Sequence, residues 1–320
     1  MSGINANKKG LEMSFAFIFA MIVGAVILFL AIYMVARLIS NSEQTHGGEV
    51  SKELSILLNP MQTSLESSKE MSIELPQETR IEDNCYYDGA FGRQTFSTSL
   101  KGIGDKWGKP GAAVPITNKY IFSPIDLEGN RLYLFSKPFD FPWKAVDIII
   151  ITSKAYCFVS PPKSVEDEIM QIKNQGGLNN LEINYSIEEC KNNSIKVCFG
   201  FACDISVYSG DEEYRIGYVE SQGNKMFYSG SLLYGAIFSD KNLYECNLKR
   251  IMKRIYQQGL LLSSESILIA NKNCNSNMEA DLNLFTTAVA HLNSSVELLQ
   301  LREIVSILNI KNSNNNCKLW

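Results

Sequence analysis

Histidine, the residue that most often carries acid–base chemistry near neutral pH, is scarce in this sequence. Only two histidines are present, His46 and His291, and they lie far apart along the chain. Because histidine is also a frequent metal ligand, the sequence favours neither a Ser-His-Asp triad nor a zinc site. We predict no catalytic residue, no metal and no cofactor.

Three short patterns carry weaker chemical signals. Ser160 and Lys163 have the Ser-x-x-Lys spacing of penicillin-recognising enzymes, but a helix cap also explains this serine, and the Lys-Thr-Gly and Ser-Asp-Asn motifs are absent. Residues 102–111 lack the third glycine of a phosphate-binding loop, and the acidic residues 211–213 lack the spaced oxygen ligands of a calcium loop. A membrane-anchored hydrolase that works without histidine is therefore an alternative, not the preferred interpretation.

Four basic residues occur at helical spacing in the C-terminal part, namely Lys249, Arg250, Lys253 and Arg254. They predict a basic surface on a helix whose opposite face is apolar. Such a surface is either solvated or in contact with an anionic polymer or lipid headgroup. The formal net charge of −4 argues against nucleic acid as a partner, since no excess of cations is available to displace counterions.

A set of aromatic residues near Pro and Gly suggests another alternative, an anchored domain that binds sugar or peptide. The set comprises Tyr86, Tyr87, Trp107, Phe139, Phe141 and Trp143. Side chains of this kind either form an exposed stacking surface or fill the core beneath loops. Both outcomes are open at the level of the sequence.

An apolar segment near the N-terminus decides the class of protein. Residues 15–36 contain no charged or strongly polar side chain. A helix of this length spans roughly 33 Å, enough to cross a hydrocarbon core of about 30 Å. A cleaved signal peptide is disfavoured because the apolar run is long and no small-x-small cleavage site follows it. We therefore predict a transmembrane helix over residues 13–39.

The charges that flank this helix predict its orientation. Lys8 and Lys9 lie in the tail of residues 1–12, and Arg37 follows the apolar segment. The bias favours a cytoplasmic N-terminus and a C-terminal domain outside. The predicted location is thus the cell membrane, with a single pass and the lipid bilayer as a partner.

Cysteine usage supports an oxidising compartment. Eight cysteines are present, and all follow the predicted anchor: Cys85, Cys157, Cys190, Cys198, Cys203, Cys246, Cys274 and Cys317. An even number in an outer domain is typical of disulfides. The sequence indicates one local pair, Cys198 with Cys203, across a hairpin turn at residues 199–202. Buried free thiols are the alternative.

The remaining patterns predict an α+β fold. A helical stalk kinked at Pro60 is expected over residues 40–76, followed by a mainly β domain with a mixed or antiparallel sheet over residues 77–239. Within it, residues 148–151 are all isoleucine and predict a strand buried on both faces. Residues 240–320 are expected to pack on this domain as helices at 240–262, 263–272 and 278–310.

The segment that leads into the anchor is Lys8-Lys9-Gly10-Leu11-Glu12-Met13-Ser14-Phe15. It resembles the start of archaeal type IV pilin-like and TadE-like proteins over about the first 40 residues. The resemblance implies that a prepilin peptidase would cut between Gly10 and Leu11, and that the helix would pack in a filament or remain an anchor. We therefore predict a non-catalytic cell-envelope protein that acts in surface assembly or adhesion, with other pilin-like subunits or envelope proteins as partners.

Overall fold

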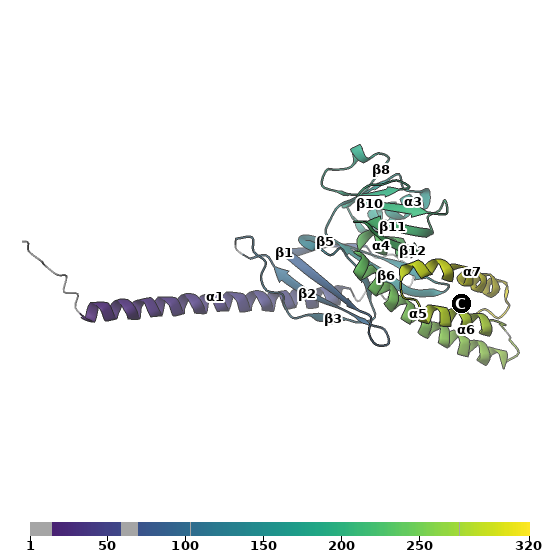
Figure 1. Cartoon of the computed structure of the whole chain (residues 1–320), viewed down its shortest axis with the longest axis horizontal. Coiled ribbons are helices and arrows are strands. Elements are labelled where there is room, and N and C mark those ends of the chain that lie inside the picture. The colour runs from purple at the N-terminus through teal and green to yellow at the C-terminus, as the bar shows by residue number, and fades with distance from the viewer. Residues whose placement is uncertain (1–14, 59–69, 103, 275) are drawn as a thin grey trace, which may run out of the picture.

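A long helix and a head built on two β-sheets make up the computed structural model (Figure 1). The structure describes residues 15–58, 70–102, 104–274 and 276–320. The helix α1 (Phe15–Leu57) protrudes from the head, and the C-terminal helices lie at the end of the head that is farthest from the start of α1. The chain is therefore α+β with one N-terminal apolar helix, as the sequence predicts.

The strands and helices follow one another in two groups. The first sheet contains β1 (Met71–Tyr86), β2 (Arg93–Leu100), β3 (Val114–Ile116), β4 (Tyr120–Phe122), β5 (Leu127–Asp140) and β6 (Lys144–Thr152). The second contains β7 (Tyr156–Val159), β8 (Leu181–Asn184), β9 (Ile195–Phe199), β10 (Ile205–Ser209), β11 (Ile216–Ser221) and β12 (Asn224–Ser229). The helices of the head are α3 (Lys163–Gly176), α4 (Leu232–Phe238), α5 (Lys241–Ala270), α6 (Glu279–Ala290) and α7 (Leu298–Asn314), with 3-10 turns η1 (Ile187–Glu189) and η2 (Ser295–Glu297).

The first sheet has the order β3-β2-β1-β5-β6-β4 and is antiparallel except where β4 pairs with β6. Successive isoleucines of β6 point to opposite faces of this sheet, because side chains alternate along a strand. Ile148 and Ile150 belong to the main core, whereas Ile149 and Ile151 belong to a second cluster under α1. The prediction of a strand buried on both faces is confirmed.

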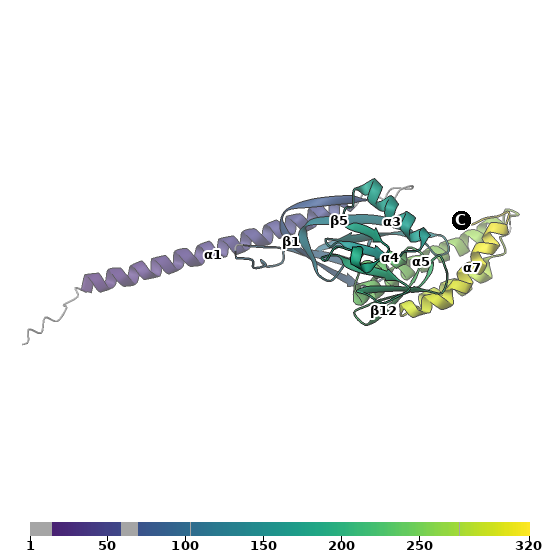
Figure 2. The same ribbon diagram turned by 90° about the horizontal axis from the view of Figure 1, so that it is seen from above.

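The second cluster connects α1 to the head. Leu54 of α1 and the adjacent Leu58 pack with Phe96 of β2 and Ile81 of β1 in this cluster, and both leucines are almost completely buried. The last turns of α1 are thus an integral part of the head, and the helix leaves it as a straight extension (Figure 2).

The second sheet has the order β12-β11-β10-β9-β7-β8. Its strands β8, β7, β9 and β10 are parallel, and α3 provides the crossover from β7 to β8. The hairpin of β11 and β12 turns at Gln222 and Gly223, both with positive φ, as is typical of two-residue hairpin turns.

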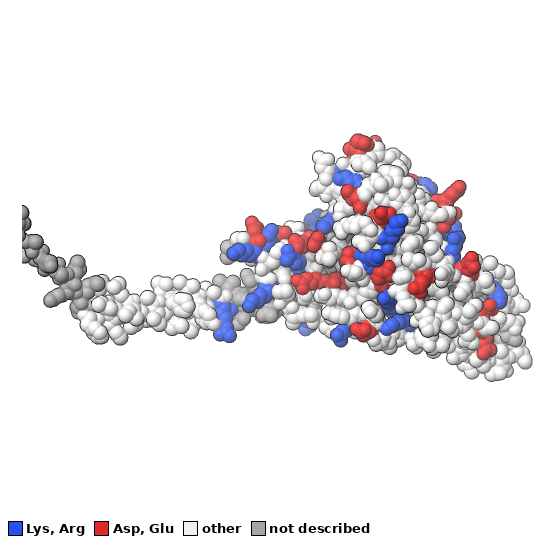
Figure 3. Space-filling model, viewed as in Figure 1, with Lys and Arg blue, Asp and Glu red and all other residues white. Residues whose placement is uncertain are grey.

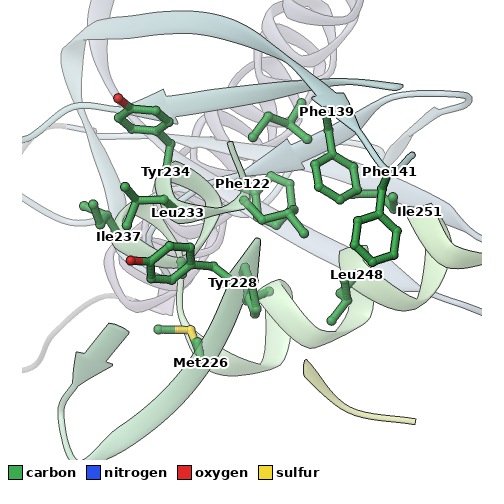
Figure 4. Close-up of a cluster of buried hydrophobic side chains, with 14 of the residues drawn as sticks. Phe122, Phe139, Phe141, Met226, Tyr228, Leu233, Tyr234, Ile237, Leu248 and Ile251 are labelled. Atoms are coloured by element: carbon green, nitrogen blue, oxygen red, sulfur yellow. The ribbon is translucent and has the colours of Figure 1, made fainter. Parts of the chain in front are cut away.

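One apolar core lies between the two sheets and the helices α4 and α5. Figure 4 shows Phe122 of β4 near Leu233 of α4, with Phe139, Phe141 and Ile251 of α5 on one side of it. The short helix α4 is buried along its whole length, since it is enclosed between the sheets. This shared core joins both sheets into one head.

Two boundaries differ from the predicted domain plan. The predicted stalk does not form a separate helix, because α1 continues without interruption from the apolar segment to Leu57. Residues 71–76 belong to β1 and not to a stalk, since their alternating side chains pair with β5 and bury Met71 and Ile73 against the second cluster. The predicted kink at Pro60 lies outside the described residues.

The hairpin predicted around Cys198 and Cys203 is wrong. Strands β9 and β10 are parallel, with Ile205 beside Val197, so the chain after Phe199 doubles back before it continues in the same direction. Gly200 adopts a positive φ there, and the Asp204 carboxylate accepts a hydrogen bond from the Lys196 backbone N–H. These local contacts hold a five-residue return that strand patterns alone do not reveal.

The C-terminal helices also divide differently. The predicted break near residue 263 does not occur, since α5 runs on to Ala270. The predicted long helix ends instead at Ala290, where the Glu297 carboxylate accepts hydrogen bonds from the Asn293 backbone N–H. Ser295 is tied to the Glu245 carboxylate of α5, so a tertiary contact separates α6 from α7.

All eight cysteines form disulfides. Two of these, Cys157–Cys190 and Cys198–Cys203, adjoin one another on the second sheet. Cys274–Cys317 fastens the C-terminal segment to the end of α5, and Cys85–Cys246 joins β1 to the start of the same helix. The predicted disulfide chemistry is confirmed.

Candidate functional site

The most distinctive surface of the protein is the apolar half of α1. The span Phe15–Leu38 contains 24 residues, and its most apolar 18-residue stretch has a mean hydropathy of 3.0. None of that stretch is buried by the rest of the chain. In Figure 3 the protruding helix is white along most of its length, in contrast to the mixed charges of the head. So large an apolar surface is unfavourable in water, and by length and composition this span could cross a bilayer.

The other half of α1 meets the head through small residues. The hydroxyl of Thr98 in β2 donates a hydrogen bond to the backbone oxygen of Gly47, and the buried Ser51 hydroxyl lies 3.3 Å from the same threonine hydroxyl. A Cβ atom on Gly47 would lie 2.6 Å from the Thr98 backbone oxygen, closer than atoms approach in folded proteins. Gly47 therefore permits close contact between helix and sheet. We call this contact the α1–β2 joint.

Sequence reasoning missed the α1–β2 joint. It placed Gly47 and Gly48 in the stalk and assigned them no packing role, although glycine usually weakens a helix. In the structure both residues are helical, and only Gly47 is in tight contact, since a Cβ on Gly48 would lie an ordinary 3.8 Å from the Ala112 nitrogen. A glycine pair within an otherwise helical pattern was the available signal for close packing.

The predicted basic surface on α5 is only partly present. Arg250 is wrong as a surface residue, because its side chain is completely buried. Its guanidinium donates hydrogen bonds to the side-chain oxygens of Gln94 and Asn247, both at 2.7 Å. Gln94 is itself buried on β2 and pairs with the backbone N–H and C=O of Ile121 in β4. Arg250 therefore links α5 to two strands of the first sheet.

The three other basic residues hold the turn between β1 and β2. Lys253 donates hydrogen bonds to the backbone oxygens of Tyr87 and Gly89, and the Lys249 ammonium lies 4.7 Å from the centre of the Tyr87 ring. Arg254 lies over the ring of Phe91 at 5.5 Å. Most of the predicted basic surface thus serves contacts within the protein.

Asp83 completes the polar cluster around Arg250. Its carboxylate accepts hydrogen bonds from Gln94 Nε2 at 3.0 Å and from the Ser123 hydroxyl at 3.2 Å. Burial raises the pKa of Asp83 to about 7, although these hydrogen bonds and the nearby Arg250 charge lower it. The Asp83 residue is half-buried, but its carboxylate points into the cluster.

The pKa of Asp83 predicts that the head loses stability between about pH 5 and about pH 8. The unfolded residue titrates near 3.9. Between that pH and about pH 7 the Asp83 carboxyl is protonated in the native state but ionised in the unfolded state. The free energy of unfolding therefore falls as pH rises. Because Asp83 is only half-buried, we expect a loss on the order of 2 kcal/mol.

Denaturant unfolding of the full chain in detergent at both pH values measures this loss. The variant Asp83→Asn should remove most of it, whereas Asp88→Asn in the exposed β1–β2 turn should leave it unchanged. An Asp83→Asn variant with the pH profile of the native chain would contradict the assignment.

The other sequence candidates do not assemble into a catalytic site. The Ser160 hydroxyl donates to the backbone oxygen of Tyr185, and Lys163 is paired with Asp167 at 2.8 Å. His291 is exposed at the end of α6. Within the described ranges, no group of three His, Cys, Asp or Glu side chains could hold a metal ion. Gly10 and Leu11, the predicted processing site, lie outside the described residues.

Of the two outcomes that the sequence leaves open for the aromatic residues, a single stacking surface is not formed by them. Phe139, Phe141 and Trp143 are buried in the main core, as Figure 4 shows for the two phenylalanines, whereas Tyr86 and Tyr87 are exposed in the β1–β2 turn. Trp107 is covered by the Arg80 guanidinium at 4.5 Å. The six residues therefore serve different parts of the fold.

Comparison of the chain with protein-family models, with curated proteins and with solved structures finds no match. The features of the molecule that bear on function are the apolar span of α1, the α1–β2 joint and the surface of the head.

Proposed function

We propose that this protein is a single-pass, non-catalytic protein of the cell envelope that acts in surface assembly or adhesion in a pilin-like manner. In this proposal the N-terminus is cytoplasmic, α1 crosses the bilayer, and the disulfide-bonded head lies outside. Neighbouring copies or other envelope proteins would contact the apolar span of α1.

The continuity of α1 carries the proposal. One helix runs from the exposed apolar span into the second cluster of the head without a flexible linker. A tether that only keeps a domain near a membrane needs no such rigid connection, whereas an assembling subunit transmits the orientation of its helix to its head. The four disulfides support an oxidising location.

Assembly through α1 predicts different oligomeric states for the full chain and for a chain that begins at Asn41. We expect the full chain to form higher oligomers in mild detergent and the shortened chain to be a soluble monomer. Light scattering coupled to size exclusion measures both. Equal oligomerisation of the two forms would contradict assembly through the helix.

The rigid connection is tested separately at the α1–β2 joint. Gly47→Ala places a Cβ against the Thr98 backbone oxygen, so we expect α1 to separate from β2 and trypsin to cut faster after the exposed Lys52. Gly48→Ala is the matched control, because it adds the same methyl group where space exists. Equal cleavage of the two variants would show that the joint does not hold α1 on the head.

A further inference from the structure

Three adjoining hollows run along one side of α5. The first, of about 240 Å³, is lined by Asn118, Tyr120, Lys144, Asp147 and Arg254 among others. The second, of about 320 Å³, shares Arg254 with the first, and the third, of about 240 Å³, shares Gln258 and Leu261 with the second. The shared residues place the three hollows side by side, and we call them together the α5 groove.

The charged end of the α5 groove contains a guanidinium without a counter-ion. Lys144 and Asp147 satisfy one another at 3.1 Å. No carboxylate of the described residues lies within ion-pair distance of Arg254, which is positioned instead by the Phe91 ring. A guanidinium over an aromatic ring can still donate its N–H groups to a carboxylate.

The other end of the α5 groove is apolar and rigid. It is lined by Trp143, Leu261, Leu262 and Trp320, with the two tryptophan rings in edge contact at 5.4 Å. The Gln258 side chain accepts a hydrogen bond from Trp143 Nε1 and donates one to the Ala145 backbone oxygen. These bonds hold the side of the groove that α5 forms against the segment of Trp143 and Ala145. Leu261 is 70% exposed and is available to a ligand.

We infer that the α5 groove binds an extended peptide segment of a partner protein, in which an acidic side chain lies four residues from an aliphatic or aromatic one. Arg254 takes the carboxylate, and the pocket of Trp143, Leu261 and Trp320 takes the apolar side chain. On α5 these anchors are seven to eight positions apart, or about 11 Å. An extended chain rises about 3.3 Å per residue and directs every second side chain to the same face, so side chains four residues apart, or about 13 Å, can reach both anchors.

An acidic polysaccharide is the competing ligand, because it also offers carboxylates to Arg254. A peptide suits the groove better, since the far end is lined almost entirely by apolar side chains and favours an apolar side chain of the ligand, which a uronate polymer lacks. The inference goes beyond assembly through α1 and does not require it, because the groove lies wholly within the head.

A random peptide library displayed on phage tests the inference. The full chain is held as single copies in lipid nanodiscs, and empty nanodiscs remove lipid binders. We expect enrichment of sequences with Asp or Glu four positions from Leu, Phe or Trp. Fluorescence anisotropy then measures the enriched peptides on native and variant chains. Binding to single copies is independent of oligomerisation, so failure here is separable from failure of the assembly proposal.

Arg254→Gln should weaken binding about tenfold and abolish the preference for Asp over Asn in the peptide. Leu261→Ser should weaken binding of the same peptides by a similar factor. Lys241→Gln, which removes one charge from the exposed start of α5, is the control and should have no effect. Three results would each overturn the inference. The first is that the motif is not enriched, and the second is that the Arg254→Gln variant enriches the same motif. The third is that less polygalacturonate than unlabelled peptide is needed to displace the bound peptides.

Discussion

Replacement of Arg250 by methionine is expected to lower the free energy of unfolding by about 3 kcal/mol. The change removes the charged donor from the side-chain oxygens of Gln94 and Asn247, and both acceptors remain buried. It also removes the positive charge that favours the ionised form of Asp83, so the loss should be larger at pH 8 than at pH 5. Denaturant unfolding at the two pH values measures both effects.

Lys249→Met is the matched control for this prediction. The two residues are adjacent on α5, and the sequence assigns both to the same basic surface. Lys249 is half-buried and keeps its charge near the Tyr87 ring, so its replacement should change stability by no more than about 0.5 kcal/mol. Similar losses in the two variants would mean that the cluster around Arg250 is no more important than the helix surface.

Loss of the Cys85–Cys246 disulfide is expected to have the largest effect of any single cross-link. The two cysteines are 161 residues apart, and the start of α5 is joined through them to the end of β1. In the chain-entropy model, release of a loop of this length destabilises the protein by about 5 kcal/mol, whereas release of a five-residue loop costs about 2 kcal/mol. The double variant Cys85→Ser, Cys246→Ser should therefore melt well below the native chain.

The control is the double variant Cys198→Ser, Cys203→Ser, since these residues are only 5 positions apart. Thermal unfolding in detergent, followed by circular dichroism, compares the three proteins. We expect the order native chain, short-loop variant, long-loop variant from most to least stable. The reverse order of the two variants would mean that local strain in the β9–β10 return is more important than chain entropy.

Together the cluster around Arg250 and this disulfide give α5 a clear structural role. Gly92 allows the β1–β2 turn to approach the stem of Arg250, because a Cβ there would lie 2.7 Å from Arg250 Cγ. The same helix lines the α5 groove from Arg254 onward. The first half of α5 therefore fastens the helix to the first sheet. The second half carries the surface that we propose for a partner.

The features that the sequence determines are those that depend on neighbouring residues. The apolar run of α1 is set by composition and length, and the burial of both faces of β6 follows from its consecutive isoleucines. The hairpin of β11 and β12 follows from its turn residues. Each of these is fixed within a short segment, where the periods of helix and strand relate side chains directly to faces.

The tertiary structure decides the features that join distant segments. Nothing near Arg250 in the sequence indicates that Gln94 and Asp83 lie beside it. The helical pattern therefore assigns Arg250 to the surface, although its partners are on strands of the first sheet. The partners of six cysteines and the parallel direction of β9 and β10 likewise depend on long-range contacts. Local periodicity determines which residues share a face, but only packing of the whole chain decides what that face meets.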